Sequence, residues 1–461
     1  MRLSQGVRVM SGWYEQAFRH VLYPAYESGL RRRDTLSWLS KYEGDQWLSP
    51  GAISELQFVR LKALLEHCYQ EVPYYRRRWR ELGITPDDIR NLDDYARLPT
   101  LTKADIRENF QDMQASSWRG RLLFKRTGGS TGEPLELGYT RESYDRRIAV
   151  MWRGYGWAGS RPGRRTLYLW AGNVGTPGRA HQWKDRLYNA MFARRVLNSF
   201  EMTESNLASY ADAIDRYRPD IIVGYVGPLA QLAHWMVATG RLVHRPESVI
   251  GAAEALHPFQ REAISQAFGC PVYNTYGCRE FMLVASECDH HHRLHVNADH
   301  LVVELLGSDG APVRCGSGEV AITDLSNYGM PFIRYVNGDL ASTSSEHSCP
   351  CGRGLPLLDR IEGRVLDAIR TPDGRILPGE FFPHMLKDVR GLSRFQLVQR
   401  QLDRLELSIV RSEGFDDDSL AYIHRETAKV LGHQVTLECR FVDDIPLTRS
   451  GKRRVTLSEL A

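Results

Sequence analysis

The chain has 461 residues, too many for one ordinary hydrophobic core, so we expect about two to four domains. Its 42% hydrophobic and 25% charged residues are typical of a soluble globular protein, and a net charge of +4 does not favour nucleic acid as a partner. No apolar run reaches the roughly 18 residues of a membrane span, and the N-terminus lacks the apolar stretch of a signal peptide. We therefore expect a cytoplasmic monomer or homodimer without a transmembrane segment.

The first hundred residues are predicted to be a mostly helical extension that packs on the main body. Leu61, Leu64, Leu65 and Cys68 recur at the spacing of one helix face, and Pro73 ends that helix. The arginine triplets at 31–33 and 76–78 lie beside aromatic residues and are interpreted as solvated surface. Contact with an anionic ligand or a membrane surface is the alternative interpretation.

The segment from about 200 to 280 alternates short apolar strands with helices. Such alternation predicts parallel βαβ units, in which ligands bind beyond the carboxyl ends of the strands. Those ends carry Gly224-Tyr225, the segment 251–254 and the segment 275–280, which together are the expected wall of a site. The predicted helices span 203–218, 229–237 and 257–268, and the predicted strands span 221–223, 248–250 and 271–273.

The pattern changes to strands between about 295 and 345, which predicts a β-rich subdomain. After Arg364 we expect a β-hairpin turning at Asp373-Gly374, then a helix, a hairpin, a helix and a strand. The predicted fold is therefore α/β. A large N-terminal domain of mixed and parallel sheets spans 1–362, including the helical extension at about 1–100, and a small, mobile α+β domain spans 363–461.

Three motifs predict a nucleotide site. The loop RTGGSTGEP at 126–134 can present backbone N–H groups and hydroxyls to phosphate oxygens, although it lacks the Gly-Lys-Ser/Thr ending of a Walker A loop. In NTYGCRE, Tyr276 can stack on a purine and Glu280 can hold Mg²⁺. In PFIRYVNGDLA, Asp339 can accept hydrogen bonds from ribose hydroxyls. The alternatives are a flexible surface loop, an ordinary turn with a surface glutamate, and a carboxylate that only caps a turn.

Two further motifs lie near the predicted small domain. RIEGRVLDAIR, at 360–370, occurs where the composition changes, and PLTRSGKRR, at 446–454, places Lys452 in a loop from which a cation can enter a site. Alone, the second motif is more often a solvated basic tail. The order of all these motifs resembles the acyl-adenylate-forming superfamily, and within it the phenylacetate–CoA ligases and their relatives from capsule and polysaccharide biosynthesis. LPTLTKADIREN and CPCGRGLPLLDRIEGR are similar to that branch.

The resemblance implies an ATP-dependent, AMP-forming ligase. It would activate a carboxylic acid as an acyl-adenylate and pass the acyl group to CoA. Lys452, Glu280 and Thr131 would be catalytic, with Mg²⁺ on Glu280, and Asp367 would be the hinge between domains. An acid pocket of aromatic character would be walled by Tyr225, Gly251 and Tyr276. The residues implied to bind the nucleotide are Thr127, Gly128, Gly129, Ser130, Thr131, Gly132, Ala253, Glu254, Asn274, Thr275, Tyr276, Asp339 and Arg364.

The chain departs from the family pattern at the phosphate site. Glu133 stands where many relatives have lysine, Cys278 and Arg279 replace small or hydroxyl residues, and Asn337 replaces a common threonine. Two readings compete with the CoA ligase. One is an adenylating ligase that transfers the acyl group to an amine or a carrier protein, and the other is a non-catalytic nucleotide-binding protein.

A cysteine and histidine cluster predicts a structural zinc site. Cys349 and Cys351 form a close pair, and Cys288 lies in ECDHHHRLH, so a tetrahedral Cys₃His site can form. His295 is the predicted fourth ligand because it matches the family's Leu-His position, with His290 or His292 as alternatives. Free thiols beside a solvated histidine run are the competing interpretation.

Overall fold

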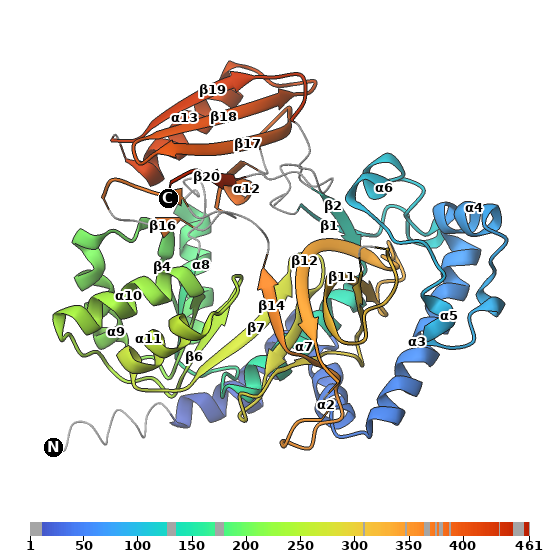
Figure 1. Cartoon of the computed structure of the whole chain (residues 1–461). Helices are drawn as coiled ribbons and strands as arrows, with labels where there is room; N and C mark the ends of the chain where they lie inside the picture. Colours follow the sequence, from blue (N-terminus) through green and yellow to red (C-terminus); the bar gives the residue numbers. More distant parts are fainter. Residues whose placement is uncertain are drawn as a thin grey trace.

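The computed structural model describes residues 12–126, 135–170, 179–307, 309–345, 348–363, 369–373, 376–377, 381–386, 389–432, 434–445 and 456–460. The small C-terminal body, red in Figure 1, lies above a larger body whose N-terminal helices flank one side. Among the described helices, none is both long and apolar enough to cross a bilayer.

The N-terminal region is helical, as predicted. Leu61, Leu64, Leu65 and Cys68 are fully buried along one face of α3, which ends at Glu71 before Pro73. The Ser49 side chain accepts a hydrogen bond from the Ala52 N–H and so caps the start of α3. The elements are the π-helical turns η1 (Phe18–Leu22) and η2 (Ala25–Leu30), then α2 (Thr35–Asp45), α3 (Pro50–Glu71), α4 (Pro73–Glu81), η3 (Pro86–Asp88), α5 (Leu92–Tyr95), α6 (Lys103–Glu108) and η4 (Ser116–Trp118).

An eight-stranded sheet forms the centre of the large body, in the order β13-β9-β8-β7-β6-β5-β3-β4. The five strands from β7 to β4 are parallel, which confirms the predicted βαβ units, and the pairs from β7 to β13 are antiparallel. The strands are β3 (Thr166–Trp170), β4 (Arg194–Asn198), β5 (Ile221–Tyr225), β6 (Ser248–Ala252), β7 (Val272–Cys278), β8 (Met282–Glu287), β9 (Leu294–Val296) and β13 (Leu357–Leu358).

Helices cover both faces of the parallel half of this sheet. One apolar cluster joins it to α9, α10 and α11, and a second joins the opposite face to the end of α7. The predicted helix at 203–218 divides into a 3₁₀ turn and α9, and α10 begins three residues before its predicted start because it follows β5 directly. The helices are α7 (Arg141–Trp157), α8 (Arg179–Met191), η5 (Ser199–Glu201), η6 (Glu204–Asn206), α9 (Leu207–Tyr217), α10 (Val226–Thr239) and α11 (Pro258–Phe268).

The predicted β-rich segment forms a second, antiparallel sheet in the order β10-β11-β12-β14. It packs on the N-terminal helices through the largest apolar cluster, which includes Leu61, Trp79, Val320 and Tyr335. Its strands are β10 (Leu301–Leu306), β11 (Gly316–Asp324), β12 (Tyr335–Thr343) and β14 (Arg360–Gly363), and a separate hairpin pairs β1 (Leu123–Arg126) with β2 (Glu136–Tyr139).

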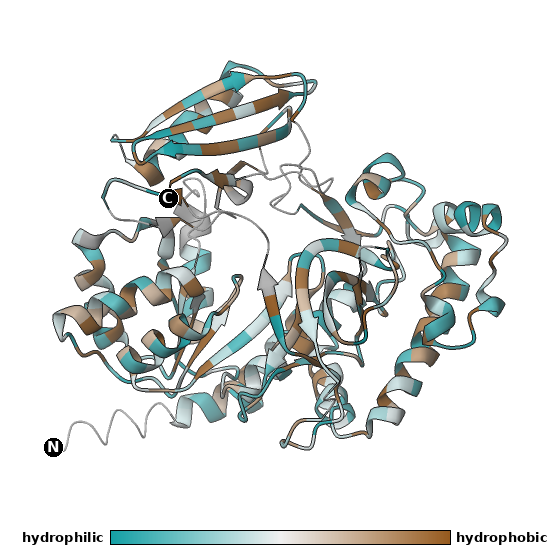
Figure 2. Ribbon diagram, in the orientation of Figure 1, coloured by the Kyte–Doolittle hydropathy of each residue, from teal (hydrophilic) through white to brown (hydrophobic). Residues whose placement is uncertain are grey.

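The C-terminal part is α+β, with the predicted order of elements and one further strand. Hydropathy alternates along β17 and β18 in Figure 2, because one face of their sheet packs on α12 and α13 and the other meets solvent. The elements are β15 (Ile369–Arg370), β16 (Ile376–Leu377), α12 (Phe381–Leu386), β17 (Leu392–Gln401), β18 (Arg404–Arg411), α13 (Asp417–Leu431), β19 (Thr436–Phe441) and β20 (Thr456–Ser458), and the four-stranded sheet runs β19-β18-β17-β20.

Candidate active site

The carboxyl ends of three parallel strands meet as the sequence predicts. Gly224 on β5 pairs in register with Gly251 on β6, and Gly251 pairs with Asn274 on β7. The Thr275 hydroxyl donates to the Gly251 carbonyl oxygen at 2.8 Å, which ties the last two strands together at this edge. The edge is therefore a continuous wall built from residues far apart in the chain.

Tyr276 and Asp339, predicted from separate motifs, are joined directly. The Tyr276 hydroxyl donates to Asp339 Oδ2 at 2.8 Å, and Asn337 Nδ2 donates to the same oxygen at 2.6 Å. All three side chains are at least nine-tenths buried. Burial, followed by the neighbouring Asp339 carboxylate, raises the pKa of Tyr276 well above its ordinary value, so its proton stays in this bond.

Glu280 lies next to this group and is 4% exposed. Its Oε1 accepts a hydrogen bond from the Tyr335 hydroxyl at 3.1 Å, which leaves the other carboxylate oxygen for a further partner. Sequence reasoning missed Tyr335 as a support of the site, and it treated Asn337 only as a departure from the family pattern. Their spacing contains the signal, since Tyr335, Asn337 and Asp339 alternate along β12 and therefore share one face of it.

The other predicted nucleotide residues follow the strand ends. Ala253 adopts a left-handed conformation with φ of 67°, which is rare for a residue with a side chain and turns the chain sharply after β6. Glu254 then accepts a hydrogen bond from the Gly227 N–H at 2.5 Å, at the start of α10. The Asn274 N–H donates to Glu287 Oε2 at 2.8 Å. These hydrogen bonds link the strand ends to α10 and β8.

Tyr225, predicted in the wall of an acid pocket, is packed against the small domain. It is 5% exposed and belongs to an apolar cluster with Ile369, Leu377 and Phe382. The Trp170 ring lies 4.5 Å from the Tyr225 ring, measured between centroids. The predicted wall is thus covered by the C-terminal part of the chain in this arrangement, while Gly251 lies in the sheet behind it.

Nine predicted site residues lie outside the described parts of the chain. These are Thr127, Gly128, Gly129, Ser130, Thr131, Gly132, Arg364, Asp367 and Lys452. The described neighbours of the first loop, Arg126 on β1 and Glu136 on β2, form an ion pair at 3.5 Å. The predicted phosphate loop therefore connects the two strands of the β1–β2 hairpin.

The four predicted zinc ligands come together. Their ligand atoms, in Cys288, His295, Cys349 and Cys351, all lie within 4.8 Å of one another. The Cys288 and Cys349 sulfurs are 3.7 Å apart, and Cys351 Sγ is 3.4 Å from His295 Nε2. A tetrahedron with Zn–S bonds of about 2.3 Å has S···S edges of about 3.8 Å, so the donor set fits Zn²⁺. The Arg353 N–H points to Cys351 Sγ at 3.5 Å, a contact that suits a thiolate.

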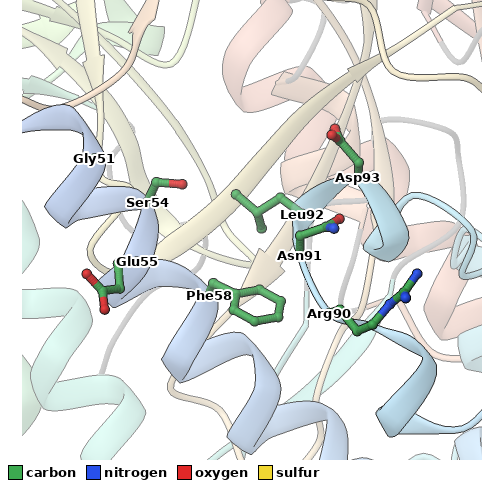
Figure 3. Close-up of a pocket in the computed structure, with 8 residues that line it drawn as sticks. All are labelled: Gly51, Ser54, Glu55, Phe58, Arg90, Asn91, Leu92 and Asp93. Carbon is green, nitrogen blue, oxygen red and sulfur yellow. The ribbon is translucent and has the colours of Figure 1, made fainter.

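Two surface cavities have described linings. One, of about 520 Å³, lies between the domains and is lined by Arg107, Phe110, Arg126 and Glu136 on one side and by the segment 389–393 on the other. Because Arg126 precedes the phosphate loop, this cavity borders the predicted site. The second, of about 510 Å³, lies between α3 and the segment 90–93 and includes none of the predicted site residues (Figure 3).

Comparison with known proteins gives consistent results. Residues 369–459 match the family model of the CapK C-terminal domain. The chain is 29% identical to a phenylacetate-coenzyme A ligase of Thermus thermophilus, over 78% of this chain and 82% of the relative. It is 26% identical to the phenylacetate-coenzyme A ligase of Escherichia coli, over 89% and 94% of the two chains. The fold matches a 2-hydroxyisobutyryl-CoA ligase solved with 2-HIB-AMP and CoA, at a TM-score of 0.62, 20% identity, and coverage of 90% of this chain and 92% of the other.

Proposed function

We propose that this chain is a member of the acyl-adenylate-forming superfamily and an AMP-forming ligase, which activates a carboxylic acid with ATP and transfers the acyl group to CoA. The observation that carries the proposal is the union of Tyr276, Asp339 and Glu280 at the edge where three parallel strands end. An aromatic ring can stack on a purine, one carboxylate can bind ribose hydroxyls, and a second carboxylate can bind Mg²⁺. The residues that provide these three groups lie together.

Each of these residues receives a role that its contacts support. Asp339 would bind a ribose hydroxyl, and Tyr276 and Asn337 orient its carboxylate by donating to Oδ2. Glu280 would hold Mg²⁺, which when bound supplies positive charge against the phosphates of ATP. Lys452, from the small domain, would place its ammonium between the substrate carboxylate and the α-phosphate. This role fits an electrostatic contact made in the transition state.

We also propose that Cys288, His295, Cys349 and Cys351 hold a structural Zn²⁺. The distances in the donor set support this ion, and all four positions are occupied by protein ligands, so no open position remains for chemistry. The ion would link three segments, which are the residues that follow β8, strand β9 and the loop that precedes β13.

The cavity between the domains supports a proposal for the acceptor. Arg107, Arg126 and Arg390 line it, and three guanidinium groups suit the phosphates of CoA.

Purified protein should be incubated with ATP, Mg²⁺ and a panel of aryl, arylacetic and hydroxy acids, with and without CoA. We expect pyrophosphate release with at least one acid, and a thioester only when CoA is present. Pyrophosphate without thioester, together with turnover upon addition of amines or a carrier protein, would reject CoA as acceptor.

A further inference from the structure

A single buried carboxylate joins three elements behind the proposed nucleotide edge. Glu287 ends β8 and is 6% exposed. Its Oε2 accepts the Asn274 N–H at 2.8 Å, and the guanidinium of Arg261 donates to both of its oxygens, at 2.5 Å to Oε1 and 3.0 Å to Oε2. Arg261, on α11, also donates to the carbonyl oxygen of Val272, the first residue of β7. The Glu287 carboxylate therefore connects α11, β7 and β8.

The backbone pairing of β7 explains what this carboxylate does in the sheet. β7 and β8 are paired in antiparallel register as far as Thr275, which lies opposite Ser286. The next pair would set Asn274 opposite Glu287, but the pairing ends there and the Asn274 N–H bonds to the Glu287 side chain instead. A buried N–H without an acceptor is costly. The side chain thus completes the sheet at the point where parallel pairing gives way to antiparallel pairing.

The contact reaches the proposed adenine wall through β7 itself. Asn274 and Tyr276 are two residues apart on this strand, so their side chains lie on the same face of it. Tyr276, the ring proposed to stack on the purine, is held at its hydroxyl by Asp339. Glu287 holds the same segment at the Asn274 N–H. Two carboxylates therefore fix the two ends of the segment 274–276.

Arg261 fixes the carboxylate in turn. A guanidinium that donates to both oxygens of a carboxylate sets its orientation as well as its position. The Arg261 side chain is 31% exposed and that of Glu287 is 6% exposed, so little water can replace a lost contact at the carboxylate. Glutamine at position 287 would offer one acceptor oxygen where glutamate offers two, and its NH₂ group would face a donor. The donors from Asn274 and Arg261 could then not all be satisfied.

We propose that Glu287 is a positioning residue for the adenine end of ATP, which fixes the segment 274–276 without touching the nucleotide and is itself oriented by Arg261. This inference rests on the proposed function, because it takes the edge of β7 as the adenine wall. Affinity for ligands that carry adenine should therefore depend on Glu287 and Arg261. Affinity for inorganic pyrophosphate, which carries no adenine, should not.

The test measures binding of AMP, and of inorganic pyrophosphate with Mg²⁺, by calorimetry on full-length protein. Loss of a buried charge-assisted contact should weaken AMP binding about 10-fold in Glu287→Gln. Arg261→Gln should weaken it by a smaller factor, because the Asn274 N–H keeps its acceptor. Pyrophosphate binding should stay near wild type in both variants. Arg241→Gln is the matched control, since Arg241 bonds to two carboxylates, of Asp212 and Asp215, outside the proposed site.

Thermal scans establish that each variant is folded at the temperature of the binding measurement. Unchanged AMP affinity in folded Glu287→Gln would overturn the inference. Equal losses of AMP and pyrophosphate affinity would also overturn it, because they indicate a general disturbance of the fold. If Glu287→Gln does not fold, Arg261→Gln decides alone, and unchanged AMP affinity in that variant would overturn the inference. If wild type binds neither AMP nor ATP, the proposed function itself fails.

Discussion

At the scale of single residues, the proposed chemistry depends on side chains whose contacts differ in kind. Tyr276 and Asp339 are fixed to each other within the body, whereas the role proposed for Lys452 requires an approach from the C-terminal part of the chain. A contact that forms only in the transition state contributes to the rate without contributing to ground-state binding. Substitution of Lys452 should therefore separate catalysis from nucleotide affinity.

We expect Lys452→Ala to lose acid-dependent ATP–pyrophosphate exchange by more than about 100-fold while it still binds ATP. Lys429→Ala is the matched control, because Lys429 is a half-exposed lysine of the same domain that pairs with Glu426 on α13. Isotope exchange and equilibrium binding of ATP give the two readouts. Exchange that survives in Lys452→Ala would remove this residue from the adenylation step.

A buried histidine makes a residue-scale prediction about stability. His300 is 1% exposed, its Nδ1 lies 3.1 Å from the Tyr42 hydroxyl, and burial lowers its pKa to about 4. Between pH 6.5 and 4 the unfolded chain takes up a proton at this position and the folded chain does not, so stability falls as pH falls.

Urea unfolding of wild type at pH 7 and pH 5 should therefore show a larger loss of stability than the same measurement on His300→Gln, by about 1–2 kcal/mol. His234→Gln, at an exposed position on α10, serves as control and should keep the wild-type pH slope. Equal slopes in His300→Gln and wild type would contradict the assigned protonation.

At the scale of elements, the cysteine cluster lies beside the edge strand β13 of the central sheet. Strand β13 is only two residues long and lies at the edge of the central sheet, where it pairs with β9 through Leu357 and Leu358. Two backbone pairs stabilise such a strand weakly. A bound ion next to it would supply the missing restraint.

Purified protein should accordingly contain about one zinc ion per chain, and Cys351→Ser should lose the ion and lower the thermal midpoint. Cys315→Ser is the control, because Cys315 is exposed and outside the cluster. Metal content by mass spectrometry and a thermal scan with and without chelator give the answer. The structural ion would be refuted if wild-type protein contained no zinc and its thermal midpoint did not change when chelator was added.

The elements also show how far sequence reasoning extends. The helices and strands between 203 and 278 were predictable because their periodicities are regular and glycine or proline marks their ends. No prediction was made for β3, β4, α7 or α8. The sequence around β4 is rich in arginine and partly exposed, so it lacks the apolar run by which a buried strand is recognised. The pairing of β7 with β8 in antiparallel sense depends on long-range contacts that no local pattern encodes.

The same limit applies to the site. Tyr276, Glu280 and Asp339 follow from motifs, and the four metal ligands follow from residue type and spacing. Tyr335 could not be assigned in this way, because it acts through Glu280, which lies 55 residues earlier in the chain. The packing of Tyr225 against Ile369 and Leu377 likewise depends on how the two domains meet.

At the scale of the whole molecule, the apolar contact between the domains has a functional consequence. The small domain covers Tyr225, which is predicted in the wall of the acid pocket, and Trp170 beside it. The proposed function therefore requires a second arrangement that gives an acceptor access. The proposed hinge, Asp367, lies just before β15, the first described strand of the small domain. Rotation of the small domain about Asp367 would replace one set of contacts between the domains by another, without changing the hydrophobic core of either domain.

Asp367→Pro should restrict this rotation, because proline fixes φ near −65°. We expect acid-dependent exchange to remain within a few-fold of wild type and transfer to CoA to fall about 100-fold, since only the second step needs the other arrangement. Asp367→Ala leaves the backbone free and should support both steps. A proline variant that forms thioester at the wild-type rate would place the hinge elsewhere.

The central claim is that this chain makes an acyl-adenylate, and the nucleotide products test it most directly. Protein incubated with ATP, Mg²⁺ and the acid panel, without CoA, should form AMP and pyrophosphate, and it should return labelled pyrophosphate into ATP only when a substrate acid is present. Formation of ADP and phosphate, or exchange that is independent of acid, would contradict adenylation.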